Sequence, residues 1–475
     1  MNKVILIDCS LTFTKIGVVH ENQLEQLYLQ NKFEQDLQNR VIQGQITDIV
    51  KNLEAVFVDF GTEKNGLLHF KQIPECYKAR LRQGQRLPVQ VMRENVGSKG
   101  HKLTAFVNIQ GKHLVCLPFE QGVSVSKKIK IPEERMRLKN WIKEQGGEKY
   151  GFIVRTSGSS ASEEELLTEL LELVKQADQL MATKDNLSKG SVLIEDKSFA
   201  LKIILDNITK VESLKIICND HNLMGEIKDN LEKYASDMKH EYVLLSSLEN
   251  VFKFYDVEKQ FGDTLKKKVW LKNGGNLVIE PTEAMTVIDV NSAKAIIKKN
   301  HDKSITQINT LAIEESIKQM IRRNISGMII IDLIELKDKK SKQDIYEYAV
   351  ECLKRLDNGR STAYPITELS LLQISRTKRY TSLYHSIYSD CSCCGAIGGE
   401  YKAAYMTYLI EAKIKDILLN TTNNKLFIKC KTNLYDYIMQ NELVNLLQKT
   451  YSIEIELTRE TKEQAEIFNI TYHIS

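Results

Sequence analysis

Thr286–Ser292, with the sequence TVIDVNS, and Met328–Glu335, with the sequence MIIIDLIE, are the two segments that decide the fold of this chain. Each is an apolar, β-branched run broken by one aspartate, which predicts a buried strand with Asp289 or Asp332 at or near its end. Burying an unpaired carboxylate is costly, so two such strands call for a shared positive charge. A hard divalent cation would supply that charge.

The segment between these strands, 304–324, has the periodicity of an amphipathic helix. Its apolar face is predicted to consist of Ile313, Ile317, Met320 and Ile321. Ser304 can cap its start, and Gly327 lies just past its end. A strand, helix, strand crossover makes the two strands parallel, so we expect Asp289 and Asp332 to meet at one edge of a sheet.

Mg²⁺ is the expected ion at this edge, because it takes oxygen ligands and often needs only one or two carboxylates beside substrate phosphate. The alternative is that each aspartate merely caps a helix or turn. For either aspartate alone we favour that alternative. For the pair together with Asn291 we favour the metal site.

Composition sets the limits for the rest of the chain. The 475 residues, 42% hydrophobic and 27% charged, are typical of a soluble globular protein of roughly three domains. No apolar run approaches the ~20 residues of a membrane span, and residues 1–8 break too early for a signal peptide, so we expect a cytoplasmic protein. A net charge of +4 excludes a uniformly basic nucleic-acid binder. Local basic clusters at 266–268 and 376–379 are candidates for polyanion contacts, although such runs are usually solvated faces.

The first hundred residues predict two β-structures. Residues 4–8 and 15–19 form a hairpin that is too small to fold alone and should dock on the α/β block 191–254. Five short strands then predict a small closed barrel: 40–46, 55–61, 66–70, 87–92 and 102–106.

Aromatic and basic side chains on this barrel are typical of OB-type surfaces that stack bases and hold a single-stranded backbone. They are Phe57, Phe60, His69 and Phe70 on the second and third strands, with Lys99, His101 and Lys102 in the loop before the fifth. The alternative, in which Phe57 and Phe60 belong to the core, must hold for at least one aromatic.

A second anion site is predicted at the end of the strand 150–156. Arg155 and Thr156, with the amides of the following loop, could bind a terminal phosphate, because guanidinium and hydroxyl donors suit phosphate oxygens. The pattern is not specific, since Arg-Thr at a strand end is common. Ser162 and Glu165 then form a capping box that opens a long scaffold helix to about residue 181.

Cys391 and Cys394 have the CxxC spacing of a zinc knuckle. Tetrahedral zinc needs two more ligands, and the simplest solution is one zinc shared by two subunits across a two-fold axis. A redox dithiol or an unbound pair is the alternative, and Cys393 could compete as a ligand. The other cysteines are isolated and are expected in the core: Cys9, Cys76, Cys116, Cys218, Cys352 and Cys430.

Taken in order, these motifs resemble the catalytic core of the ribonuclease E/G family, from near the start to about residue 400. The resemblance rests on NLEAVFVDFG at 52–61, IVRT at 153–156, PTEAMTVIDVNS at 281–292, IDLI at 331–334 and the CxxC. Within the family the chain resembles the short G type, which lacks a long disordered tail. Two departures matter: Leu67 stands where a second aromatic is common, and Ser392 and Cys393 replace the usual proline and basic spacer.

The resemblance implies a multidomain α/β architecture. Its expected parts are an RNase H-like subdomain (1–35 and 200–278), an inserted S1-like OB barrel (36–118), a 5′-sensor subdomain (119–199), a DNase I-like catalytic subdomain (279–388), a zinc link (389–399) and a small α/β dimerisation domain (400–475).

The resemblance also assigns roles to residues. It implies Mg²⁺ ligands at Asp289 and Asp332, an orienting Asn291, a 5′-monophosphate pocket at Arg155 and Thr156, RNA contacts at Phe57 and Lys99, and Zn²⁺ ligands at Cys391 and Cys394. The expected activity is Mg²⁺-dependent endonucleolytic cleavage of single-stranded RNA, stimulated by a 5′-monophosphate and leaving 5′-phosphate and 3′-hydroxyl ends, in rRNA processing and mRNA decay. The expected assembly is a zinc-linked homodimer that could pair into a dimer of dimers.

The sequence leaves two other functions as alternatives. One is a non-catalytic RNA-binding or assembly scaffold that uses the same barrel and zinc link. The other is a Mg²⁺-dependent phosphoesterase acting on DNA. Neither accounts for all the motifs, because a pure binder has no need of two interrupted strands with Asn291 between them, and a DNA enzyme leaves the 5′-phosphate pocket unexplained.

Overall fold

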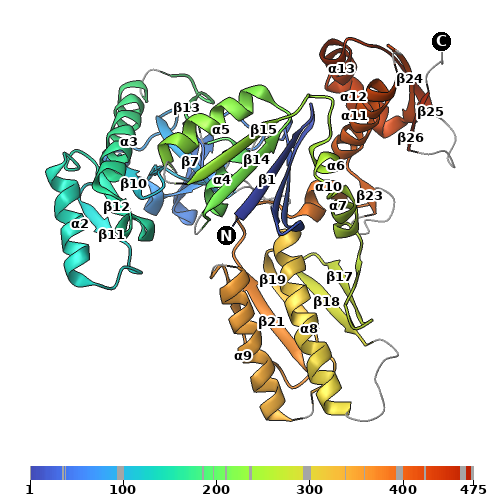
Figure 1. Cartoon of the computed structure of the whole chain (residues 1–475). Helices are drawn as coiled ribbons and strands as arrows, with labels where there is room; N and C mark the ends of the chain where they lie inside the picture. The colour runs from blue at the N-terminus through green and yellow to red at the C-terminus, as the bar shows by residue number, and fades with distance from the viewer. Residues whose placement is uncertain are drawn as a thin grey trace. The chain divides into compact units, whose positions relative to one another are not determined.

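The computed structural model of the chain describes residues 2–34, 37, 39–93, 101–184, 187–195, 197–208, 211–234, 238–292, 301–336, 338–357, 359–391, 399–421, 424–460 and 467–471. The chain divides into two compact units (Figure 1). One unit combines Met1–Glu34 with Asp206–Ser475, and the other is Gln35–Leu205. Among the described residues, no helix combines the length and the apolarity that crossing a membrane requires.

The unit 35–205 begins with a closed five-stranded barrel, as the sequence predicts. Its strands are β4 (Val41–Val50), β5 (Ala55–Asp59), β6 (Gly66–His69), β7 (Arg86–Arg93) and β8 (Lys102–Thr104). They are ordered β4-β5-β6-β8-β7, and β7 pairs back to β4, which closes the barrel in an arrangement that fits an OB fold. Strand β13 (Val192–Ile194) adds to β4, and the short helix α1 (Glu75–Lys78) follows β6.

The rest of this unit is a four-stranded sheet with two helices. The strands are β9 (Ile109–Gln110), β10 (Leu114–Leu117), β11 (Val123–Val125) and β12 (Gly151–Val154), in the order β11-β12-β10-β9. Helices α2 (Pro132–Glu144) and α3 (Glu163–Thr183) pack on the same hydrophobic core. The predicted capping box of α3 is confirmed, with Ser162 and Glu165 bonded reciprocally.

The other unit contains a five-stranded sheet in the order β15-β14-β1-β2-β3 (Figure 1). Its strands are β1 (Asn2–Cys9), β2 (Phe13–His20), β3 (Gln23–Asn31), β14 (Ser213–Cys218) and β15 (Lys239–Leu244). Strand β1 runs parallel to β14, so the predicted docking of the N-terminal hairpin on the later α/β block is confirmed. The helices that follow these strands in the same unit are α5 (His221–Tyr234), α6 (Val251–Phe254) and α7 (Glu258–Thr264), and the boundary between the two units falls within α4 (Phe199–Asn207).

A second, six-stranded sheet of this unit carries the two aspartate-containing segments, 286–292 and 328–335. Its strands, in spatial order, are β16 (Lys268–Trp270), β17 (Asn276–Pro281), β18 (Met285–Asn291), β19 (Gly327–Asp332), β21 (Leu371–Arg376) and β20 (Ser361–Ala363). Helices α8 (His301–Arg322) and α9 (Lys339–Leu356) run alongside it (Figure 1) and share one hydrophobic core with it. The core takes alternate strand residues, such as Ile288, Ile329 and Ile331, so one face of the sheet is buried under the helices.

Helix α8 corrects two predicted boundaries. It already includes His301–Lys303, so Ser304 is not its cap. Its end is set by Asn324, whose left-handed φ of 52° lets the Ile325 amide donate to the Met320 carbonyl at 2.9 Å. Gly327 instead begins β19.

The C-terminal part forms a small α/β structure joined by a hairpin. Its elements are α10 (Leu383–Ile387), β22 (Tyr388–Ser389), β23 (Glu400–Tyr401), α11 (Ala403–Asn420), β24 (Lys425–Lys431), α12 (Thr432–Gln440), α13 (Leu443–Tyr451), β25 (Glu454–Glu460) and β26 (Phe468–Thr471). The sequence pattern predicts one helix near 435–447. This prediction is wrong, because Glu442 has a left-handed φ of 53° that separates α12 from α13. The expected burial of Cys76 is also wrong, since this thiol is exposed, whereas the other five isolated cysteines are buried.

Candidate active site

The two aspartates of the interrupted strands are direct cross-strand neighbours. Strands β18 and β19 are adjacent and parallel, and their register pairs Asp289 with Asp332. Neighbouring strands lie about 4.8 Å apart, and paired residues point to the same face of the sheet. The two carboxylates therefore project side by side, as the crossover argument predicts.

Their burial differs from the prediction. Asp289 is half-buried and Asp332 is exposed, because helices α8 and α9 pack on the opposite face. The cost of burying the two carboxylates is therefore not the reason to expect a cation at this site. The physical reason that remains is repulsion, since like charges directly opposite each other on adjacent strands destabilise the pair.

Asn291 completes this group from the same strand. Its Nδ2 donates to Oδ2 of Asp289 at 2.6 Å. Two residues apart on β18, both side chains project from the same face. The amide thus fixes the rotation of the Asp289 carboxylate beside Asp332.

The loop that follows Asp332 is braced by a residue that sequence reasoning missed. Asn309 of α8 is fully buried; its Nδ2 donates to the Ile334 carbonyl at 2.8 Å and its Oδ1 accepts from the Ile334 amide at 3.0 Å. The Ser370 hydroxyl accepts from the Leu336 amide at 3.1 Å. These contacts fix the backbone two to four residues after the carboxylate.

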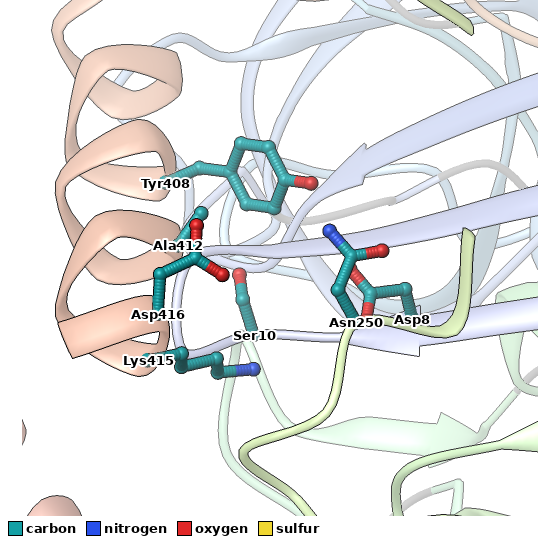
Figure 2. Close-up of a pocket in the computed structure, with 7 residues that line it drawn as sticks. All are labelled: Asp8, Ser10, Asn250, Tyr408, Ala412, Lys415 and Asp416. Carbon is teal, nitrogen blue, oxygen red and sulfur yellow. The ribbon is translucent and has the colours of Figure 1, made fainter. Parts of the chain in front are cut away.

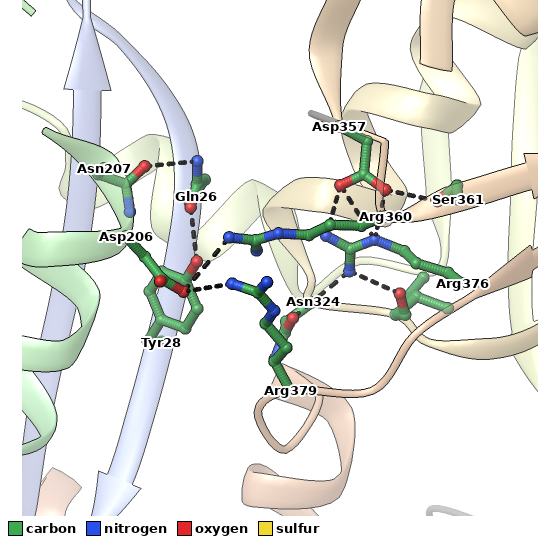
Figure 3. A network of polar contacts seen from close by, with 11 residues as sticks. Gln26, Tyr28, Asp206, Asn207, Asn324, Asp357, Arg360, Ser361, Arg376 and Arg379 are labelled. Atoms are coloured by element: carbon green, nitrogen blue, oxygen red, sulfur yellow. Dashed lines mark hydrogen bonds and ion pairs between the residues drawn. The ribbon is translucent and has the colours of Figure 1, made fainter. Parts of the chain in front are cut away.

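A buried ion pair braces the far end of the same sheet (Figure 3). The guanidinium of Arg376, at the end of β21, donates to both Asp357 oxygens and to the Ile325 carbonyl at 2.8 Å. Arg360 and Arg379 converge on one oxygen of Asp206 at 3.3 and 3.1 Å. The turn that leads from α8 into β19 is thus held by charge-assisted bonds.

The donor set at this site fits Mg²⁺ better than a metal held by protein alone. The described parts of the chain contain no group of three or more His, Cys, Asp or Glu suited to hold a metal ion. Mg²⁺ commonly uses one or two carboxylates, retains waters and takes its remaining ligands from substrate phosphate. Asp289 and Asp332 present that minimal set on an accessible face.

A small pocket elsewhere in the same unit is not part of this group. It is lined by Asp8, Ser10, Asn250, Tyr408, Ala412, Lys415 and Asp416 (Figure 2). Asp8 accepts from Asn219 Nδ2 at 2.9 Å, and Lys415 Nζ donates to the Cys9 carbonyl at 3.1 Å. These bonds connect β1 to the residue after β14 and to α11. We therefore interpret the pocket as a small gap in the packing between these elements.

On the barrel, two of the side chains predicted to contact RNA, Phe57 and Lys102, lie in one cross-strand row. Phe57 of β5 pairs with Leu67 of β6, which pairs with Lys102 of β8. Phe57 is half-buried and Lys102 is exposed, whereas Phe60 is 2% exposed and belongs to the barrel core. The core alternative therefore holds for Phe60 and not for Phe57. Lys99 lies outside the described residues.

The two residues of the predicted phosphate pocket directly follow β12. Arg155 and Thr156 are exposed; Arg155 Nη1 donates to the Gly111 carbonyl at 2.9 Å, and Thr156 Oγ1 lies 3.1 Å from Ser126 Oγ. Burial lowers the pKa of the neighbouring His113 imidazole, which keeps it neutral near pH 7. Ser126 was missed because it lies 30 residues away in sequence and no motif marks it.

The predicted zinc site is only partly described. Cys391 is half-buried and its Sγ lies 3.7 Å from Glu400 Oε1. Cys393 and Cys394 lie outside the described residues. The flanking strands β22 and β23 pair with each other, Tyr388 with Tyr401, so the CxxC lies in the connection of a hairpin.

Comparison with known proteins gives consistent similarities. The family model of the Ribonuclease E/G family matches residues 108–379. The chain is 28% identical over 473 residues to ribonuclease G of Haemophilus influenzae, covering 96% of this chain and 95% of that protein. It is 25% identical to ribonuclease G of Escherichia coli K12, covering 87% and 88%. It is 32% identical over 371 residues to ribonuclease E of Synechocystis, covering 75% of this chain and 54% of that protein.

Proposed function

Because this chain belongs to the ribonuclease E/G family and is an endoribonuclease that processes RNA, we propose that it cleaves single-stranded RNA at the Asp289–Asp332 pair with the help of Mg²⁺. The observation that carries the proposal is the register of β18 and β19, which makes the two carboxylates direct neighbours on an accessible face. Two adjacent carboxylates are a poor surface for RNA unless a cation lies between them and the phosphate.

The residues of the chain have separate tasks in this mechanism. Asp289 and Asp332 would hold the ion and so place the scissile phosphate beside the two carboxylates. Asn291 keeps the Asp289 carboxylate in one orientation through its 2.6 Å bond. When bound, Mg²⁺ would polarise the phosphate, favour ionisation of the attacking water and offset charge on the departing 3′-oxygen. Attack by water rather than by the 2′-hydroxyl gives 5′-phosphate and 3′-hydroxyl ends.

Two surfaces of the unit 35–205 would select the substrate. The row Phe57, Leu67 and Lys102 offers one aromatic, one aliphatic and one cationic contact to a single strand. Arg155 and Thr156 offer a guanidinium and a hydroxyl to a terminal 5′-monophosphate. We propose that this second surface stimulates cleavage of RNA that carries such an end.

We also propose the finer division of the chain and its assembly. The strand order β3-β2-β1-β14-β15 supports an RNase H-like subdomain, and the sheet with α8 and α9 supports a DNase I-like catalytic one. The hairpin position of Cys391 supports a zinc link to a second copy through the CxxC, with residues 400–475 as the dimerisation domain.

The test of the activity is an isosteric neutralisation. Asp289→Asn should reduce Mg²⁺-dependent cleavage of a labelled single-stranded oligoribonucleotide by about 10² to 10³-fold or more, the size of effect that follows loss of one charge-stabilising group. Glu283→Gln, which neutralises an exposed carboxylate on the same hairpin, is the matched control and should cleave normally. Unchanged cleavage by Asp289→Asn would refute the assignment. RNA binding without any Mg²⁺-dependent cleavage in the unaltered chain would favour a scaffold instead.

A further inference from the structure

The face of the second sheet that carries the aspartates is unexpectedly apolar. Met328 is 53% exposed on it, and Val278, Val287 and Ile330 lie half-buried beside it. By strand alternation these residues share the face of Asp289 and Asp332, opposite α8 and α9. An apolar surface that adjoins a phosphodiesterase site calls for an occupant with apolar parts of its own.

The edge strand β16 adds an aromatic and a cation to this face. The register pairs Trp270 with Asn276, and Asn276 with Asn291. In the next row it pairs Lys268 with Val278, and Val278 with Asp289. Trp270 and Lys268 are thus two strand spacings, about 10 Å, from the catalytic group on the same face.

The two side chains of β16 interact with each other. Lys268 Nζ lies over the Trp270 ring, 4.4 Å from its centroid. Trp270 is 66% exposed, so most of its side-chain surface is accessible. The residue that packs β16 against the hydrophobic core is Val269, not Trp270. Lys268 makes no ion pair with a described residue, whereas the preceding Lys267 pairs with Glu280 at 3.3 Å. The ring is therefore not required for packing, and the Lys268 charge is not neutralised locally.

We propose that Trp270 stacks on a base of the substrate close to the scissile phosphate and that Lys268 binds a neighbouring phosphate of the same strand. This inference rests on the proposed catalytic role of Asp289 and Asp332 and names how the same face holds RNA. Aromatic rings stack on any base, and a cation beside the ring follows the backbone, so the pair would grip single strands with little sequence preference. Single-stranded RNA fits because its bases cover apolar surface while its phosphates pair with the ammonium.

The occupant could otherwise be a second copy of the chain, which would cover the apolar residues without using the cation. The charge on Lys268 and the alignment of its row with Asp289 and Asp332 favour RNA. Self-association through this face is therefore treated as an outcome of the test.

The chain provides a spectroscopic readout that does not depend on cleavage. It has only two tryptophans, Trp141 and Trp270. In a Trp141→Phe, Asp289→Asn background, Trp270 is the only tryptophan and the RNA remains intact. Titration with a 5′-monophosphorylated single-stranded oligoribonucleotide should quench its fluorescence through base stacking. Oligonucleotides that each lack one base, at successive positions, should then be compared. Trp270 fluorescence should recover when the missing base is the one near the cleavage site.

Affinity and turnover provide the second readout. In the Asp289→Asn background Trp270→Ala should weaken oligonucleotide binding by roughly 5- to 100-fold, the range expected from loss of one stacked base. In the otherwise unaltered chain it should raise KM more than it lowers kcat, and Trp270→Phe should recover most of the loss. Phe254→Ala, which truncates a 55% exposed aromatic on α6, is the matched control and should bind normally.

Each outcome decides the proposal. Binding and KM unchanged in Trp270→Ala, or no quenching by RNA, would overturn it. A lower molecular mass of Trp270→Ala in sedimentation with normal RNA binding would also overturn it and assign the face to self-association. If Asp289→Asn still cleaved while Trp270→Ala bound RNA weakly, the catalytic assignment would fail and the stacking contact would stand.

Discussion

Asn309→Ala is the substitution that most directly tests how Asp332 is positioned. The Asn309 side chain is fully buried in α8 and bonds to both peptide groups of Ile334, two residues after the carboxylate. Alanine keeps the helix, because it has the highest helix propensity, but it leaves the amide and the carbonyl of Ile334 without these partners.

The expected cost follows from those two groups. An unsatisfied buried donor or acceptor costs about 1–3 kcal/mol, so the loss of both gives about 2–6 kcal/mol. Ile334 is half-buried, and water can reach its peptide groups once the loop shifts, which places the cost at the lower end, about 2 kcal/mol. Displacement of a catalytic group by about 1 Å can cost about 10²-fold in rate, so we expect kcat to fall by one to two orders of magnitude with little change in RNA affinity.

The assay combines single-turnover cleavage with hydrogen exchange of peptides covering β19 and the loop 333–336. Ser316→Ala is the matched control, because Ser316 lies on the same helix, is fully buried and has a hydroxyl without a partner among the described residues. Removing that hydroxyl should leave exchange and cleavage unchanged or slightly improve stability. Normal cleavage by Asn309→Ala, with exchange in 333–336 equal to that of Ser316→Ala, would refute the bracing role.

Two further predictions concern the substrate end and the assembly. Arg155→Ala should lower kcat/KM on 5′-monophosphorylated RNA about tenfold or more, as expected for loss of a charge-assisted hydrogen bond, and should not change kcat/KM on RNA with a 5′-hydroxyl. Arg137→Ala, which removes another exposed arginine, is the control. Equal slowing of both RNAs by Arg155→Ala would argue against a sensor. Removing zinc with a chelator, or Cys391→Ser, should halve the molecular mass in light scattering, while an unchanged mass in a metal-free sample would exclude a zinc-linked dimer.

The meeting of the two aspartates at one edge of a sheet could be predicted, because it depends on local rules, whereas their exact register comes from the structure. A strand, a helix and a second strand in succession form a parallel crossover, which brings Asp289 and Asp332 to one edge of the sheet. The barrel was predictable for a similar reason, since short strands separated by glycine-containing turns leave few arrangements. In both cases strands that are consecutive in sequence supply much of the pairing, although the barrel is closed by β6–β8 and β4–β7, which are not consecutive.

What could not be predicted depends on partners distant in sequence. Residues 328–331 are apolar at every position, which favours burial on both faces, but α8 and α9 cover only one, and Met328 and Ile330 face outward. Asn309 was missed because its partners are backbone atoms 25 residues away, which no side-chain pattern encodes. The break at Glu442 was missed because no glycine or proline marks it.

The candidate site is therefore contained almost entirely in the unit β18–α8–β19. Residues 285–336 supply both aspartates, Asn291 and the bracing Asn309. The apolar side of α8 packs on β18 and β19 in one core and so holds the two strands in register. One helix thus fixes the spacing of the carboxylates through its packing and the orientation of the second one through Asn309. Because the opposite face needs no core packing, it is available for the substrate. Substitutions on the buried side of α8, such as at Ile317, should consequently alter cleavage and stability together, whereas those at Trp270 should alter RNA contacts alone.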